Sequence, residues 1–162
     1  MRIALCRGRR PGCPVAVLRT TPGGPTPPGN VESVATRDDA QRFITELPGT
    51  TEGLRFRHVT WFVDGAPFAW DRPFSKADLK RFGDQTPPEG PLLALRVDDL
   101  LEKEVVLADT SEAVFTIPHF EGFAAVLVQL SAVDRDELRE LVVGAWAACA
   151  PRELVERHLG MR

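Results

Sequence analysis

From residue 36 onward, apolar residues recur with two different spacings, and each spacing predicts a different kind of secondary structure. Apolar residues three or four positions apart predict helices at Thr36–Leu47, at Ser75–Phe82, from Asp98 or Asp99 to Asp109, at Asp134–Cys149, and after Pro151. Alternating or short continuous apolar runs predict strands at Leu54–Val63, Ala66–Arg72, Leu92–Val97, Val114–Pro118 and Ala124–Leu130. This mixture predicts an α+β domain.

Four of the predicted helices begin at residues whose side chains can cap them, and for one of the four the cap is Asp98 or Asp99. Thr36 precedes two aspartates, and Ser75 lies three positions before Asp78, which is the spacing of a capping box. Asp134 is followed three positions later by Glu137, so we expect the same arrangement there. The helix that starts at Asp134 has the clearest apolar stripe: Leu138, Leu141, Val142, Ala145, Trp146 and Cys149.

The helix that ends near Asp109 combines an apolar stripe with an acidic start. Four of its apolar residues are expected to face inward: Leu100, Leu101, Val105 and Ala108. Four carboxylates lie near its first turn: Asp98, Asp99, Glu102 and Glu104. Carboxylates at that end favour the helix dipole, which explains them without a metal ion. No metal and no cofactor is predicted.

Asp64-Gly65 is a strong signal for a two-residue hairpin turn between the first two predicted strands. Counting back from the turn predicts pairs on one face, which is expected to be buried: Trp61 with Phe68, Val59 with Trp70, and Arg57 with Arg72. The same count places His58 opposite Asp71 on the other, more exposed face.

Composition and charge narrow the functional classes. The chain has 162 residues, of which 43% are apolar, and this is enough to bury one core. No apolar run approaches the roughly 20 residues needed to span a bilayer, so a membrane partner is not expected. Residues 1–30 hold five arginines and no acid, which leaves 15 basic and 23 acidic side chains and a net charge of −8 for the rest. Nucleic-acid binding would therefore need a local basic patch.

Residues 1–34 differ in composition from the rest of the chain. The segment Thr20–Asn30 is rich in proline and glycine, and its apolar residues show no helical or strand periodicity. We expect a disordered extension, or a start that is mis-assigned and really lies near Val31 or Val34. Residues 35–162 form the predicted domain. Three cysteines without a C-x-x-C pair (Cys6, Cys13 and Cys149) favour reduced thiols and a cytoplasmic location.

Four groups of side chains are candidates for a site. His58 opposite Asp71 is an imidazole that a carboxylate could orient toward a ligand. Arg57 opposite Arg72 would repel unless an anion or an acidic side chain, such as Glu52 or Asp84, lies between them. The other two are His119 in the turn after Pro118, and a basic cluster on the short helix: Lys76, Lys80 and Arg81. A turn histidine and a solvated helix face are the simpler interpretations of these last two.

Several segments together resemble the MmcQ/YjbR family. They include VDGAPFAW, LALRVDD, FTIPHFEGFAAVLVQL (Phe115–Leu130) and ELRELVVGAWAACAPREL, and the resemblance covers Thr36–Leu159. The segments Pro118–Gly122 and Ala145–Pro151 are the most specific parts. The resemblance implies a CyaY-like fold, with an antiparallel sheet and helices packed on one face. Members are commonly called DNA-binding proteins because their hairpins resemble a double wing. The chain departs from the family where Val59 replaces an expected proline.

Two functional hypotheses follow, and both are non-enzymatic, because the chain has no P-loop, nucleophile elbow or dinucleotide fingerprint. The first is DNA binding through a local patch: Arg55, Arg57, Arg72, Lys76, Lys80 and Arg81. The alternative is a small ligand or a protein partner, and no nucleic acid, on the open sheet face around His58, Asp71 and His119.

Overall fold

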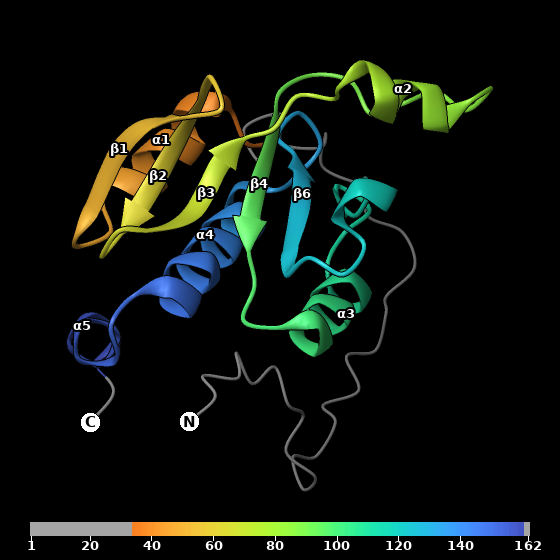
Figure 1. Cartoon of the computed structure of the whole chain (residues 1–162). Helices are drawn as coiled ribbons and strands as arrows, with labels where there is room; N and C mark the ends of the chain where they lie inside the picture. Colours follow the sequence, from red (N-terminus) through yellow and green to blue (C-terminus); the bar gives the residue numbers. More distant parts are fainter. Residues whose placement is uncertain (1–33, 161–162) are drawn as a thin grey trace, which may run out of the picture. The chain divides into compact units, whose positions relative to one another are not determined.

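Six strands form one antiparallel sheet in the order β1-β2-β3-β4-β6-β5, as the computed structural model shows (Figure 1). The structure describes residues 34–160. These residues belong to one compact unit, residues 33–162. Apart from Val34, which bridges to Asp134, the predicted disordered extension therefore lies outside the described residues. The predicted α+β fold with an antiparallel sheet is confirmed.

The elements follow one another with short connections. The strands are β1 (Thr50–Arg55), β2 (His58–Val63), β3 (Ala66–Asp71), β4 (Leu92–Arg96), β5 (Val114–Phe115) and β6 (Ala125–Gln129). The helices are α1 (Arg37–Thr45), α2 (Lys76–Phe82), α3 (Leu100–Asp109), α4 (Arg135–Cys149) and α5 (Arg152–Leu159). A 3-10 helix, Pro118–Phe120, precedes β6. No helix in the described part of the chain is long and apolar enough to cross a membrane.

The predicted helix starts are largely confirmed. Thr36 and Ser75 each form a full capping box, with Asp39 and with Asp78. Asp134 caps α4 by accepting a hydrogen bond from the Asp136 backbone N–H at 2.9 Å. The predicted capping role of Glu137 is wrong, because its carboxylate accepts bonds from the backbone N–H and hydroxyl of Ser111 instead. Glu137 thereby ties the loop before β5 to α4.

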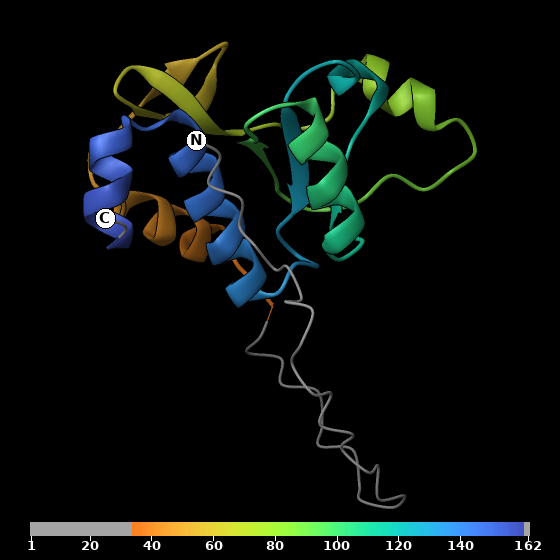
Figure 2. The same ribbon diagram turned by 90° about the horizontal axis from the view of Figure 1, so that it is seen from below.

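The main core lies between the sheet and the helices α1, α4 and α5, which share one side of it (Figure 2). Its largest fully buried side chains include Trp61 and Trp146. The indole N–H of Trp146 donates to the carbonyl of Pro48 at 3.0 Å, so the ring is buried with its polar atom satisfied. Cys149 packs against this core and donates to the Pro67 carbonyl at 3.8 Å. Burial raises the pKa of its thiol, although the nearby Arg96 opposes the effect.

A second, smaller cluster covers part of the opposite face. It contains the buried residues Ala94, Ile117, Phe120, Ala125 and Leu127, with Trp70, Phe74, Phe82 and Phe115 packed against them. The 3-10 helix and the end of α2 therefore cover β4, β5 and β6 on this side. Within the described residues, no helix lies over β1 and β2 there (Figure 1). The implied packing of helices on one face thus holds for the larger helices, and the open face is limited to one half of the sheet.

The predicted strand Leu54–Val63 is in fact two strands joined by a second tight turn at Phe56-Arg57. The turn at Asp64-Gly65 is confirmed, and Val63 pairs with Ala66 next to it. A bulge between Trp61 and Phe62 then shifts the register. Consequently the pairs predicted beyond it are wrong, and the observed pairs are Trp61 with Ala69 and Thr60 with Trp70. The bulge lets Trp61 and Phe68 both point into the main core.

The predicted orientation of α3 is also wrong. Leu100, Leu101 and Val105 are exposed, and Ala108 is exposed with them. The inward face instead carries Lys103, which is buried, with Val106 and Leu107 packed against the main core. The ammonium group of Lys103 donates to two backbone carbonyls, and these bonds satisfy its charge at a buried position that an apolar residue would normally occupy.

Candidate nucleic-acid interface

The tip of the β1–β2 hairpin is the most unusual local structure of the described chain. Arg55 and His58 form the last pair of the ladder, and Phe56 and Arg57 alone make the turn. Both have positive φ, 51° and 68°. A two-residue turn of this kind needs positive φ at both central positions, which is why asparagine, aspartate and glycine normally occupy them. Bulky L-residues in that conformation carry backbone strain.

The side chains at the tip project into solvent. Phe56 is 82% exposed, and the Arg55 guanidinium lies over its ring at 5.2 Å. Leu54, Arg55 and Arg57 are exposed as well. Within residues 34–160, neither Arg55 nor Arg57 forms an ion pair, because the observed salt bridges all involve other arginines. The tip therefore presents an aromatic ring between two uncompensated positive charges.

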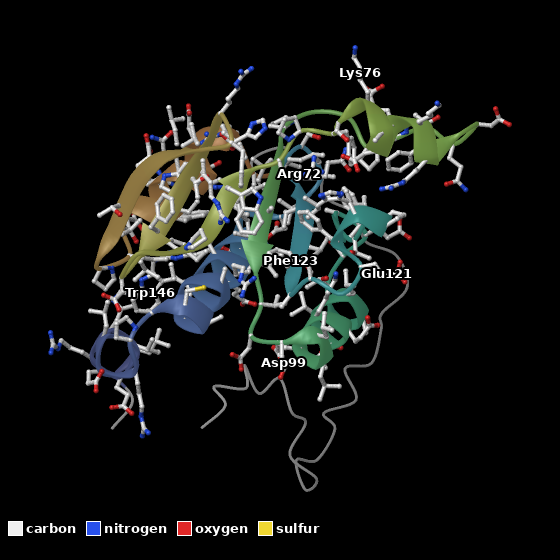
Figure 3. The ribbon with its side chains drawn as sticks, in the orientation of Figure 1. Arg72, Lys76, Asp99, Glu121, Phe123 and Trp146 are labelled. Atoms are coloured by element: carbon white, nitrogen blue, oxygen red, sulfur yellow. The ribbon has the colours of Figure 1, made fainter. Side chains whose placement is uncertain are left out.

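The α2 helix lies at the same end of the sheet as the hairpin tip, since the Arg55–His58 pair, the end of β3 and the start of β4 are all there. Lys76, Lys80 and Arg81 are exposed on α2, and none of them is ion-paired within the described residues. Figure 3 shows Lys76 pointing outward from α2, with Arg72 beneath the linker that leads to it. The three cations thus lie at the same end of the sheet as the tip, across the strands from it (Figure 1).

A buried carboxylate holds α2 in place. Asp78 accepts hydrogen bonds from the Ser75 hydroxyl at 2.7 Å and from the Ser75 backbone N–H at 2.9 Å. The Arg72 guanidinium pairs with the same oxygen at 2.9 Å. Burial alone would raise the pKa of Asp78, but the bonds from Ser75 and the Arg72 charge outweigh it and hold the pKa at about 2. Asp78 therefore stays ionised and links β3 to α2.

The predicted pairing of Arg57 with Arg72 is wrong, because Arg57 lies in the turn and Arg72 follows β3. A carboxylate partner for Arg72 was expected, and it exists, but it is Asp78. The suggested Glu52 instead accepts a hydrogen bond from the Trp61 indole at 3.0 Å. Arg72 also lies over the Phe120 ring at 5.6 Å, so its charge is largely engaged inside the domain.

The predicted His58–Asp71 pair is likewise wrong. His58 pairs with Arg55 across the β1–β2 ladder. Asp71 forms a salt bridge with Arg37 at 2.6 Å, on the side of the sheet that α1 covers. The bulge at Trp61 shifts the β2–β3 register, so Asp71 is not opposite His58. His119 is exposed in the 3-10 helix, where its ring centroid lies 6.1 Å from that of Phe120.

A cluster of aromatic rings on the less covered face was not predicted as a site. Phe123 lies 6.3 Å from Trp70 and 5.8 Å from Phe120, and the Arg96 guanidinium lies over it at 5.0 Å. Figure 3 shows Phe123 in front of β4 and β6. Trp70 and Phe123 alternate with ordinary strand and turn residues in the sequence, so no motif marked them. Among the described residues, no group of three or more His, Cys, Asp or Glu is arranged to hold a metal ion.

Comparisons with known proteins place the chain among bacterial relatives. No family model matches it. It is 40% identical over 129 residues to the uncharacterised proteins Mb2600 of Mycobacterium bovis and Rv2570 of Mycobacterium tuberculosis, covering 78% of this chain and 97% of each relative. It is also similar to the crystal structure of Deinococcus radiodurans protein DR2400, a DUF419 domain, with a TM-score of 0.52 and 21% identity over 80% of this chain and 91% of that one. That likeness shows a shared fold, which is the MmcQ/YjbR-type fold. The chain belongs to the family of the mycobacterial proteins Mb2600 and Rv2570.

Proposed function

We propose that this protein binds nucleic acid through the tip of the β1–β2 hairpin and the α2 helix at the same end of the sheet, and that it acts by binding without catalysis. The observation that carries the proposal is the Phe56-Arg57 turn. A strained turn exposes an aromatic ring and two unpaired guanidinium groups at the end of a narrow two-stranded ribbon. Phe56 and Arg57 are both unfavourable in the backbone conformation of this turn, so contact of their side chains with a partner accounts for their presence.

The chemistry of the tip fits a nucleic acid. Guanidinium groups contact phosphates and release counterions, which supplies affinity without regard to sequence. An exposed phenylalanine can stack on an unpaired base or wedge between base steps in a groove. A two-stranded ribbon is narrow enough to enter the major groove of duplex DNA. The tip offers both kinds of contact at one point.

The α2 helix supplies a second set of phosphate contacts. Lys76, Lys80 and Arg81 are exposed there, at the end of the sheet that carries the tip. The rest of the domain has an excess of acidic side chains, which repels phosphates and confines the proposed binding to this end. Resemblance to the MmcQ/YjbR family, whose members are called DNA-binding proteins, adds support of a general kind.

Fluorescence anisotropy tests the proposal with labelled duplex and single-stranded DNA at low and moderate salt. We expect saturable binding at about 50 mM salt that weakens steeply toward about 200 mM. Phe56→Ala should reduce affinity about ten-fold, since base–aromatic stacking contributes about 1–3 kcal/mol per base. Phe62→Ala, a change to a half-buried phenylalanine of the same hairpin, is the matched control. Absence of salt-sensitive binding, or equal losses in both variants, would refute the proposal.

A second candidate function rests on the aromatic cluster around Phe123. Trp70, Phe123 and the Arg96 guanidinium offer a stacking surface for a small planar anion on the partly open face. Titration with nucleoside monophosphates, followed by tryptophan fluorescence, tests it. Binding that is lost in Phe123→Ala but kept in Phe56→Ala would favour this site over the hairpin tip.

A further inference from the structure

The α3 helix presents an apolar stripe that nothing in the described part of the chain covers. Leu101 is 60% exposed and Val105 is 46% exposed, one helical turn apart on the same side. Leu100 and Ala108 are exposed beside them. This is the stripe that the sequence pattern predicts as core-facing, so the residues have the spacing of a packing surface but no packing partner among residues 34–160.

A groove lies next to this stripe. It has a volume of about 690 Å³, and one wall is the outer side of α3, including Leu100, Leu101 and Glu104. The other wall is the segment Thr116–Gly122, which contributes Ile117, Pro118 and Glu121. The groove is therefore lined by apolar side chains with a carboxylate on each wall.

Lys103 fixes the two walls to each other. It is 4% exposed and lies at the base of the groove. Its ammonium group donates to the carbonyl of Phe120 at 2.6 Å and to that of Phe123 at 3.0 Å. Burial lowers the pKa of Lys103, while Glu104 and Glu121 oppose the shift. Because these bonds join α3 to the opposite wall, the groove is already formed in the free protein.

The surroundings of the groove are strongly acidic. Between residues 98 and 122 the sequence contains seven acidic side chains, and its one lysine or arginine is Lys103. Lys103 is buried, so its charge is not presented to a partner. The exposed acids include Asp98, Glu104, Asp109, Glu112 and Glu121. The groove therefore combines apolar walls with a negative rim.

We propose that the groove binds a basic amphipathic helix of a partner protein. Two apolar side chains of that helix, four positions apart, fit against Leu101 on one side of the groove and Ile117 and Pro118 on the other, and the helix extends along the stripe over Val105. Lysine or arginine side chains beside them pair with Glu104 and Glu121 on the two walls. The proposal is independent of nucleic-acid binding, which uses the other end of the sheet and the opposite charge.

The charge argues for this occupant over others. A second copy of the chain, bound through the same face, would bring Glu104 and Glu121 of both copies together, and like charges in an interface are repulsive. Phosphate-bearing partners, such as nucleic acid or an anionic lipid surface, would meet the same repulsion. A basic peptide gains from both the apolar walls and the rim.

Isothermal titration with synthetic peptides tests the proposal. The probe is a helical peptide of about four turns with leucine at i and i+4 and lysine or arginine elsewhere, and a scrambled peptide of the same composition is its control. We expect saturable binding of the amphipathic peptide, and about ten-fold weaker binding of the scrambled one. Leu101→Ser and Val105→Ser should each weaken binding at least about five-fold. Leu79→Ser is the matched control, because Leu79 is also 46% exposed on a helix but lies on α2.

Charge-reversal variants distinguish specific binding in the groove from non-specific hydrophobic binding. Glu104→Lys with Glu121→Lys should abolish binding of the basic peptide and allow binding of a peptide with glutamate in place of its cations. Thermal unfolding of each variant checks that the domain remains folded. No saturable binding below about 1 mM, equal binding of the scrambled peptide, or equal loss in Leu79→Ser would overturn the proposal. Self-association of the free chain that Leu101→Ser abolishes would also overturn it, by naming a second copy as the occupant.

Discussion

The two tight turns of the β1–β2–β3 meander have the same length and nearly the same backbone, yet opposite chemistry. Asp64 and Gly65 turn the chain with φ of 48° and 77°, and Phe56 and Arg57 do so with φ of 51° and 68°. Aspartate and glycine are among the residues that this geometry favours, and phenylalanine and arginine are not. One turn is built for stability, and the other keeps two large side chains in solvent at the expense of stability.

The difference separates a structural from a functional explanation. If hairpin formation were the only requirement, residues suited to positive φ would be expected at both tips, because each strained residue costs about 1–2 kcal/mol. Of the two tips, only the one with an exposed ring and uncompensated arginines places bulky side chains at positive φ. The Asp64-Gly65 tip has no comparable side chains to offer a partner.

Placing phenylalanine and arginine in the Asp64-Gly65 turn should produce the largest loss of stability. In Asp64→Phe/Gly65→Arg, two residues that tolerate positive φ are replaced by two that do not, so the free energy of unfolding should fall by about 2–3 kcal/mol. Gly65 has open space around it, so a steric clash would not contribute to the loss. Chemical denaturation measures the change. An unchanged stability would mean that the geometry imposes no strain and would remove the basis of the comparison.

Removing the anchor of α2 should have a slightly smaller effect. Asp78 has a pKa of about 2 in the folded protein against 3.8 unperturbed. Because its folded pKa is depressed, the carboxylate stabilises the fold at pH above about 4, and this contribution is lost as the pH falls through about 2. The shift corresponds to roughly 2 kcal/mol, so Asp78→Asn should lower stability by about that much at pH 7.

The pH dependence gives this prediction its control. The difference between the denaturation curves of wild type and Asp78→Asn should shrink steadily as the pH falls from about 4 toward 2, because the wild-type carboxylate becomes increasingly protonated. A difference that is the same at pH 7 and at pH 2.5 would show that Asp78 acts by packing and not by charge. Asp136→Asn, at the solvent-exposed start of α4, serves as the comparison variant.

The smallest effect is expected from single charges at the tip. Arg57→Ala should weaken DNA binding several-fold and reduce the slope of log affinity against log salt by about 0.9 for duplex DNA, because one phosphate contact is lost. Arg157→Ala, on the exposed surface of α5 far along the chain, should change neither. Anisotropy titrations at several salt concentrations measure the slope. Equal slopes in wild type and Arg57→Ala would exclude Arg57 from phosphate contact.

The sequence predicts most of the fold because much of it depends on local chemistry. The capping boxes at Thr36 and Ser75 need only side chains three positions apart, and the Asp64-Gly65 turn needs only two suitable residues. The Phe56-Arg57 turn contains no residue that signals a turn, so it is absent from the prediction. The bulge at Trp61 depends on packing against helices far away in the chain, which no local pattern encodes.

In the candidate site, too, the sequence predicts features that depend on single residues and does not predict those that depend on tertiary structure. The cations of the interface are evident in the sequence, and Arg55, Arg57 and the α2 cluster were all predicted. Their neighbours were not, because the bulge at Trp61 shifts the register on which the His58–Asp71 pair depended, and the second turn removes Arg57 from the strand. The outward face of α3 was missed for a related reason. Lys103 reaches carbonyls about twenty positions away, and only the tertiary structure brings them within hydrogen-bonding distance.

The central claim is that the Phe56-Arg57 turn gives up stability in order to bind. The variant Phe56→Asn/Arg57→Gly tests it most directly, since it installs the residues that the geometry favours and removes the proposed contacts. Unfolding and DNA anisotropy should be measured on the same preparation. The account predicts that the variant is more stable by about 1 kcal/mol and binds DNA at least about ten-fold more weakly. A variant that is no more stable, or that binds as tightly as wild type, would contradict the claim.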